Sequence, residues 1–151
     1  MSSPVDDAKA AAIDWAVRNL IGRYCAAVAE FSPERFAACW ALDAEWVAKG
    51  NVITGRDRIV RVFARLREPF ALCVQEPLSG VLDVESAESA TAQWQIRELQ
   101  FPGGGAPGTQ LLGIYTDRYA PVDGRWCFAR REFRELFRGP LDTTGTLAGE
   151  G

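Results

Sequence analysis

The chain has 151 residues, of which 48% are apolar and 25% charged, and this length and composition are typical of one soluble globular domain. Its formal net charge of −3 argues against a nucleic-acid binder that depends on overall basicity. The sequence contains no histidine. This excludes Ser-His-Asp and Cys-His nucleophile systems, zinc sites with imidazole ligands, and any side chain whose unperturbed pKa lies near neutrality.

The beginning of the chain is predicted to be helical. Apolar residues recur at three- and four-residue steps from Asp7 to Val28, which indicates one amphipathic helix. Ser32 and Pro33 are typical of the start of a second helix, because serine caps a helix and proline fits its first turn. We expect this second helix to end near Leu42.

A short hairpin and a third helix are predicted next. Residues 45–49 and 52–53 form strand-like runs on either side of a tight turn at Gly50-Asn51. Apolar residues at helical spacing follow Gly55, and Pro69 is expected to end that helix.

Beyond Pro69 the pattern changes to strands. Proline cannot donate a ladder hydrogen bond, so Pro77 predicts a bulge or break in the first of them. The glycine- and proline-rich segment 102–108 predicts a loop, and Asp123-Gly124 predicts a tight turn. The expected strands cover residues 71–84, 90–101, 110–119 and 125–137, with a polar tail from Gly139.

Three helices followed by a long antiparallel sheet predict an α+β fold. We expect the sheet to curve around the helices and form a conical barrel with an internal pocket for a small molecule. One domain is expected over residues 1–151, with a core of about 8–140 and a tail at 141–151.

The four cysteines indicate a reduced protein. None of them lies at C-x-x-C spacing, so a metal or redox centre is not expected, and buried free thiols are the simpler interpretation. No basic and apolar leader and no run of about 20 apolar residues is present, so we expect a cytoplasmic protein without a membrane partner. The cysteines are Cys25, Cys39, Cys73 and Cys127.

Strand alternation identifies Glu98 as a candidate general acid or base. Successive side chains of a strand point to opposite faces, so Glu98 shares a face with the apolar residues Ala92, Trp94 and Ile96. Desolvation on such a face suits proton transfer. The alternative is that Glu98 lies at the rim of the pocket or forms an ion pair with an arginine such as Arg131.

Asp117 follows the same logic on the next strand. It shares a face with Leu111, Tyr115 and Tyr119, and an ionised carboxylate there needs a partner, which Arg131 could supply. Arg118 is the other candidate partner.

Tyr24 lies on the apolar stripe of the first helix, where a buried tyrosine needs a hydrogen-bond partner. A packing role and a catalytic role at the cavity both remain open.

Five segments carry a resemblance to a known family. They lie in the first helix, at the entry to the first strand, at the start of the third helix and in the last two strands. The chain resembles the SnoaL-like group of the nuclear transport factor 2-like superfamily, which includes hexachlorocyclohexane dehydrochlorinase, scytalone and bile acid dehydratases and, more distantly, ketosteroid isomerase. The segments are Ile21–Tyr24, Asp43–Trp46, Gly55–Ile59, Tyr115–Tyr119 and Asp123–Arg131.

The resemblance covers roughly residues 8–140 and implies a SnoaL-like domain. It implies a deep apolar pocket, no cofactor, proton-transfer chemistry on hydrophobic substrates, and a homo-oligomer, either a trimer or a dimer.

Three residues match functional positions of this group. Tyr24 falls where ketosteroid isomerases keep an oxyanion-hole tyrosine. Asp117 falls on their second oxyanion-hole position, a carboxylic acid kept protonated by an apolar site. Arg131 falls on the arginine that lines the dehydrochlorinase pocket.

The familiar bases of the group are absent. The resemblance places the aspartate of the His-Asp pair at Ala29 and the histidine at Gln75, and it places the isomerase base near Ala48. An amide such as Gln75 forms hydrogen bonds but has no useful basicity. Any catalysis must therefore use other groups.

The resulting hypothesis is a cofactor-independent lyase or isomerase of the dehydratase or isomerase type, acting on a small hydrophobic, aromatic or polycyclic substrate. Glu98 would move the proton, Tyr24 and Asp117 would polarise an oxygen, and Arg131 would fix an anion or orient Asp117. The alternatives are a binding or accessory protein that has lost the His-Asp pair, and an assembly domain. The expected substrate-binding residues are Trp46, Phe63, Leu66, Phe70, Cys73, Gln75, Trp94, Tyr115 and Phe133, and no metal ligands or nucleic-acid partner are expected.

Overall fold

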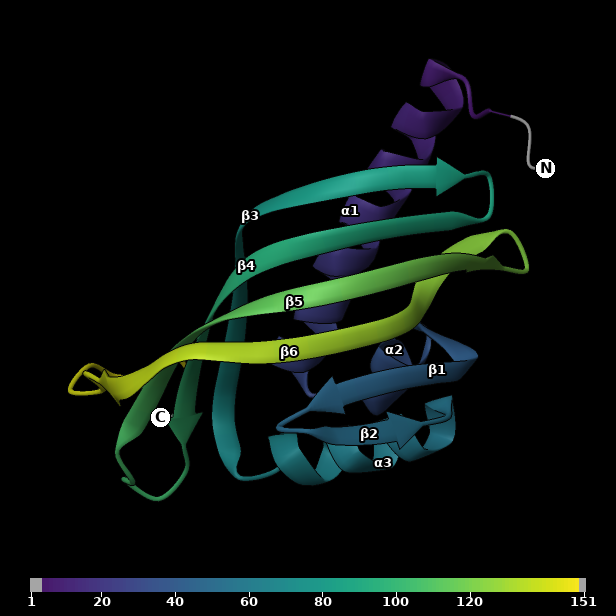
Figure 1. Cartoon of the computed structure of the whole chain (residues 1–151). Coiled ribbons are helices and arrows are strands. Elements are labelled where there is room, and N and C mark those ends of the chain that lie inside the picture. Colours follow the sequence, from purple (N-terminus) through teal and green to yellow (C-terminus); the bar gives the residue numbers. More distant parts are fainter. Residues whose placement is uncertain (1–3, 150–151) are drawn as a thin grey trace.

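The computed structural model describes residues 4–149, which form three helices and six strands. Two helices precede the first two strands, the third helix follows them, and the regular elements after it are all strands (Figure 1). The elements are α1 (Asp7–Glu30), α2 (Pro33–Ala37), β1 (Trp40–Ala48), β2 (Asn51–Thr54), α3 (Arg56–Arg67), β3 (Phe70–Ser86), β4 (Ser89–Pro102), β5 (Gly108–Val122) and β6 (Arg125–Leu141).

Helix α1 is the central helix, and one side of it packs against the concave face of the sheet. The side chain of Asp6 caps its first turn by accepting a hydrogen bond from the backbone N–H of Lys9, at 2.8 Å. Its apolar stripe, from Ile13 to Val28, is buried against the sheet. Figure 1 shows β3 to β6 crossing over α1.

The prediction that α2 ends near Leu42 is wrong, because α2 ends at Ala37 and β1 begins at Trp40. Ser32 does cap the helix, by accepting from the N–H of Arg35. The helix stops early because the backbone joins the sheet: the N–H of Phe128 donates to the carbonyl of Cys39 at 2.8 Å. Helix spacing and strand alternation are hard to distinguish over so few residues.

The six strands form one sheet in the order β2-β1-β6-β5-β4-β3. Every neighbouring pair is antiparallel except β1 and β6, which run parallel. The α+β prediction is confirmed, with the correction that the curved sheet stays open and is not wholly antiparallel. Strand alternation predicts which face a residue takes, but it carries no information on which strand lies alongside or in which direction.

The connections between strands agree with most of the turn predictions. Asp123 and Gly124 have positive φ angles of 50° and 77°, as a two-residue hairpin turn requires. The first hairpin turn is one residue earlier than expected, at Lys49 and Gly50, with φ angles of 51° and 76°. The pairing of β3 with β4 shifts register after Pro77, which confirms the predicted break.

The last strand is longer than the sequence indicates. Gly139 and Pro140 continue β6, where Pro140 lies opposite Thr109 of β5. Glycine and proline are poor strand formers, so the pattern alone ends the strand too soon.

The cysteines are free thiols, of which Cys39, Cys73 and Cys127 are buried and Cys25 is half-buried. Among the described residues, no helix has the length and apolar character needed to cross a membrane.

A substitution at Gly113 should disturb the sheet beneath the pocket. A Cβ on Gly113 would overlap the ring of Phe133 and lie 2.9 Å from the backbone oxygen of Arg134. We expect Gly113→Ala to lower the free energy of unfolding by about 1–3 kcal/mol, measured by chemical denaturation.

Gly22→Ala is the matched control. Gly22 is an exposed position inside α1 with no atom within 4 Å of the added Cβ. It should raise the free energy of unfolding by about 0.5–1 kcal/mol, because alanine restricts the unfolded chain. Equal stability changes in the two variants would contradict the close contact at Gly113.

Candidate functional site

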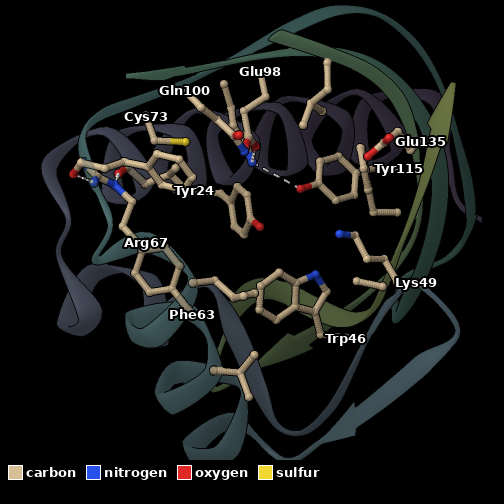
Figure 2. A pocket seen from close by; sticks show the side chains of 18 of the residues that line it. Tyr24, Trp46, Lys49, Phe63, Arg67, Cys73, Glu98, Gln100, Tyr115 and Glu135 are labelled. Carbon is tan, nitrogen blue, oxygen red and sulfur yellow. Dashed lines mark hydrogen bonds between the residues drawn. The ribbon is translucent and has the colours of Figure 1, made fainter. Parts of the chain in front are cut away.

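A cavity of about 480 Å³ lies between the helices and the concave face of the sheet. This volume is within the range of small-molecule sites. Figure 2 shows side chains from α1, α3 and several strands pointing into it. Its apolar lining consists of Val28, Trp46, Ala48, Ile53, Val62, Phe63, Leu66, Phe70, Leu111 and Phe133.

The structure places eight of the nine expected substrate-binding residues on this cavity. They are Trp46, Phe63, Leu66, Phe70, Cys73, Gln75, Tyr115 and Phe133.

Trp94 does not line the cavity. It shares a strand face with Glu98, but α1 covers that part of the sheet: Arg18 of α1 lies 5.2 Å from the centre of the Trp94 ring. The indole N–H of Trp94 donates to the hydroxyl of Tyr119 at 2.8 Å.

Glu98 is the carboxylate at the centre of the lining. Its Oε2 accepts a hydrogen bond from Nε2 of Gln75, and its Oε1 accepts one from Nε2 of Gln100, both at 2.6 Å. Within residues 4–149 it has no ion pair, so the expected alternative of pairing with Arg131 is not observed. Two neutral amides therefore fix the position of both oxygens and leave the negative charge without a cation.

Two phenols face the same cavity. Tyr24 comes from α1 and Tyr115 from β5, and Figure 2 shows both hydroxyl ends directed into the cavity. Nε2 of Gln75 lies 3.3 Å from the hydroxyl of Tyr115. Burial raises the pKa of Tyr115 to about 12 and that of Tyr24 well above its usual value. Both phenols therefore stay protonated at neutral pH and can donate hydrogen bonds.

Cys73 also faces the cavity, and burial together with the negative charge of Glu98 raises the pKa of its thiol. A protonated thiol is a weak nucleophile, so Cys73 contributes to the shape of the cavity.

Asp117 and Arg131 lie together, outside the cavity lining. Nε of Arg131 is 3.2 Å from Oδ1 of Asp117, and both side chains are almost completely buried. The hydroxyl of Tyr119 donates to Oδ2 of Asp117 at 2.6 Å.

The rings of Tyr24 and Tyr115 separate Arg131 from the cavity. The guanidinium carbon lies 3.5 Å from the centre of the Tyr115 ring and 4.3 Å from that of Tyr24. A cation over an aromatic face is stabilised by the electrons of the ring. The structure thus brings Tyr24 and Glu98 together on the cavity and places Asp117 with Arg131 behind it.

Sequence reasoning missed several polar groups of the lining. Gln100 could have been found, because it lies two residues after Glu98 and so on the same strand face. Arg67 could have been found from the spacing of Ile59, Phe63 and Arg67 on one face of α3. The other missed residues are Lys49, Asn51, Glu135 and Arg138.

Arg67 closes one end of the cavity. It is 5% exposed and donates to the backbone oxygens of Val28 at 2.8 Å, Ala29 at 3.2 Å and Phe70 at 2.5 Å. These bonds satisfy carbonyls at the end of α1, where the helix dipole is negative. They connect α3 to α1 and to the start of β3.

Comparisons with known proteins agree with this architecture. A family model described as a SnoaL-like domain matches residues 9–132. No curated protein sequence matches the chain.

Several solved structures have a similar fold. One is a candidate scytalone dehydratase from Novosphingobium aromaticivorans, 22% identical, with a TM-score of 0.84 over 91% of this chain and 93% of that one. The dehydrochlorinase LinA is 23% identical, with a TM-score of 0.84 over 93% and 97%. A type 3 LinA from Novosphingobium barchaimii is 20% identical, with a TM-score of 0.83 over 94% and 99%.

The Asp117 carboxyl should titrate well above an ordinary aspartate. Burial raises its pKa to about 6, and Arg131 and the Tyr119 hydroxyl offset part of that rise. Because the folded pKa exceeds the unfolded value, this group stabilises the fold fully below about pH 4 and loses that contribution as the pH rises through about 6. The loss amounts to roughly 3 kcal/mol. An NMR titration of carboxyl-labelled protein would measure the pKa of Asp117. A value at or below 4 would contradict this prediction.

Proposed function

The chain belongs to the SnoaL-like family, and we propose that it is a cofactor-independent lyase or isomerase that moves a proton on a small, largely apolar molecule. The fold is shared with a candidate scytalone dehydratase and with LinA dehydrochlorinases. The observation that carries the proposal is the place of Glu98, a carboxylate on an otherwise mostly apolar cavity with two protonated phenols.

Glu98 is the best candidate for the base. The resemblance places the family histidine at Gln75, and Gln75 donates to Glu98 at 2.6 Å. The carboxylate is therefore within one hydrogen bond of that position. The other acidic residue of the lining, Glu135, is bound by Arg138 at 2.8 Å, which leaves Glu98 as the carboxylate free of a cation among the described lining residues.

The phenols suit the opposite role. When Glu98 removes a proton from a carbon, the electron pair of that C–H bond becomes an enolate or the new double bond of an elimination. Negative charge then develops on an oxygen or a leaving group. Tyr24 or Tyr115 can donate a hydrogen bond to it, because both stay protonated. Exclusion of water by the apolar wall strengthens these interactions.

Arg131 and Asp117 act through other residues in this proposal. The cation lies against the rings of Tyr24 and Tyr115 and opposes part of the rise in their pKa values. It therefore makes both phenols stronger hydrogen-bond donors while it remains out of reach of the ligand. Asp117 holds Arg131 in place.

A second candidate is a protein that binds the same ligand without changing it. The specific observation in its favour is that Ala29 and Gln75 stand where the resemblance places the catalytic pair, and that both oxygens of Glu98 already accept hydrogen bonds.

One experiment separates the two candidates. A panel of aromatic and polycyclic ketones, alcohols and chlorides is first screened for an increase in melting temperature. Compounds that bind are then incubated with the protein in D₂O, and mass spectrometry follows deuterium uptake or elimination. We expect Glu98→Gln to keep binding and to lower the rate by roughly 10²–10⁴-fold, because the general base is lost.

Glu76→Gln is the matched control. Glu76 is the residue after Gln75, points to the other face of the sheet and is bound by Arg97 at 2.7 Å. It should keep the wild-type rate. Exchange that is equally fast in Glu98→Gln would refute Glu98 as the base, and binding without exchange or turnover would establish the second candidate.

A further inference from the structure

Two nitrogen donors on one wall of the cavity have no acceptor among residues 4–149: the buried indole N–H of Trp46 and the ammonium of Lys49, which is an exposed residue at the rim. Trp46 is 8% exposed, and its indole N–H is buried with no hydrogen-bond partner in the described part of the chain. Lys49 lies three residues later and has no carboxylate within 4.0 Å among the described residues, whose ion pairs all involve arginine. Both line the cavity, and Figure 2 shows both nitrogen ends turned toward its open centre.

The hairpin of β1 and β2 holds these two donors in place. Trp46 is paired with Ile53 across the hairpin, and Ala48 is paired with Asn51 just before the turn. Lys49 is the first residue of that two-residue turn. The Lys49 side chain therefore starts from a short, hydrogen-bonded hairpin and reaches inward from the rim.

The charges on the lining leave one cation for a ligand. Three cationic side chains and two acidic ones line the cavity. Arg138 is occupied by Glu135, and Arg67 by three backbone carbonyls. Lys49 remains.

The indole N–H is the more specific of the two donors. Away from water, a donor without an acceptor loses its hydrogen bonds to solvent and gains nothing in return. An oxygen of a bound ligand would restore that bond. Because a lysine ammonium is nearby, a negatively charged oxygen would bind here more tightly than a neutral one, since charge-assisted hydrogen bonds are stronger than neutral ones.

We propose that Lys49 and Trp46 form a subsite for an anionic group, so that the ligand is an organic acid with an apolar body. This rests on the proposed function, because it takes the cavity to be a small-molecule site. The acid group lies against β1, and the apolar body packs on residues such as Phe63. Figure 2 shows Glu98 on the side of the cavity opposite Trp46, so the reacting carbon of this ligand lies away from its acid group.

A pair of probes tests the subsite apart from any catalysis. 2-Naphthoate and 2-naphthamide share a ring system and differ in charge. We expect wild-type protein to bind the carboxylate about tenfold more tightly than the amide in isothermal titration calorimetry at low salt. The difference should shrink at high salt, because the rim is exposed to solvent.

Lys49→Met should abolish the preference for the carboxylate and leave amide binding nearly unchanged, since methionine keeps an apolar stem. Trp46→Phe should also reduce the preference, because phenylalanine has no N–H. Lys9→Met is the matched control: Lys9 is the only other lysine, lies exposed on α1 and does not line the cavity. It should keep the full preference.

The outcomes separate this proposal from the proposed function. Equal affinity of the wild type for both probes, or an unchanged preference in Lys49→Met, overturns the anionic subsite and leaves the small-molecule cavity intact. If neither probe binds to the wild type, the anionic subsite is overturned, and the proposed function is judged by the panel of ketones, alcohols and chlorides.

Discussion

The buried guanidinium of Arg131 is the contact on which the interior of this protein depends. Arg131 extends from β6 and forms an ion pair with Asp117 of β5. Its guanidinium also packs against the ring of Tyr24 from α1 and the ring of Tyr115 from β5. A cation that is 1% exposed must be compensated locally, because removal from water costs several kcal/mol. One carboxylate and aromatic faces provide that compensation here. The central helix is thereby fixed against the sheet at the point where packed core gives way to cavity.

This arrangement divides the polar interior into two compartments. On one side, Trp94, Tyr119, Asp117 and Arg131 form a chain of contacts closed off from the cavity. On the other side, the cavity contains a carboxylate held by two amides. The two tyrosine rings are the partition, with their hydroxyls on the cavity side and a cation behind them. The positive charge of Arg131 can thus lower the pKa values of the two phenols that face the cavity, although Arg131 itself does not contact a ligand.

Much of the candidate site could be predicted from the sequence. The period of two along β4 and β5 placed Glu98 and Tyr115 on the concave face, and the helical stripe placed Tyr24 there. Alternation could not distinguish Glu98 from Asp117, because both lie on concave faces of neighbouring strands. The two residues differ in their position along the strands. Asp117 lies in the half of the sheet that α1 covers, which is core, and Glu98 lies in the half beyond α1, which lines the cavity. The same reason explains why Trp94 lies outside the lining.

The sequence by itself determined the α+β class, the central helix, most turns and the face taken by each strand residue, because these depend on local spacing and on the conformations that glycine and proline allow. Its lack of histidine also excluded the family's usual base. Only the tertiary structure decided that Gln75 and Gln100 hold Glu98, that β1 lies beside β6, and that Lys49 reaches the cavity from a turn. Those facts join residues far apart in the chain, and no local period records which strand packs beside which.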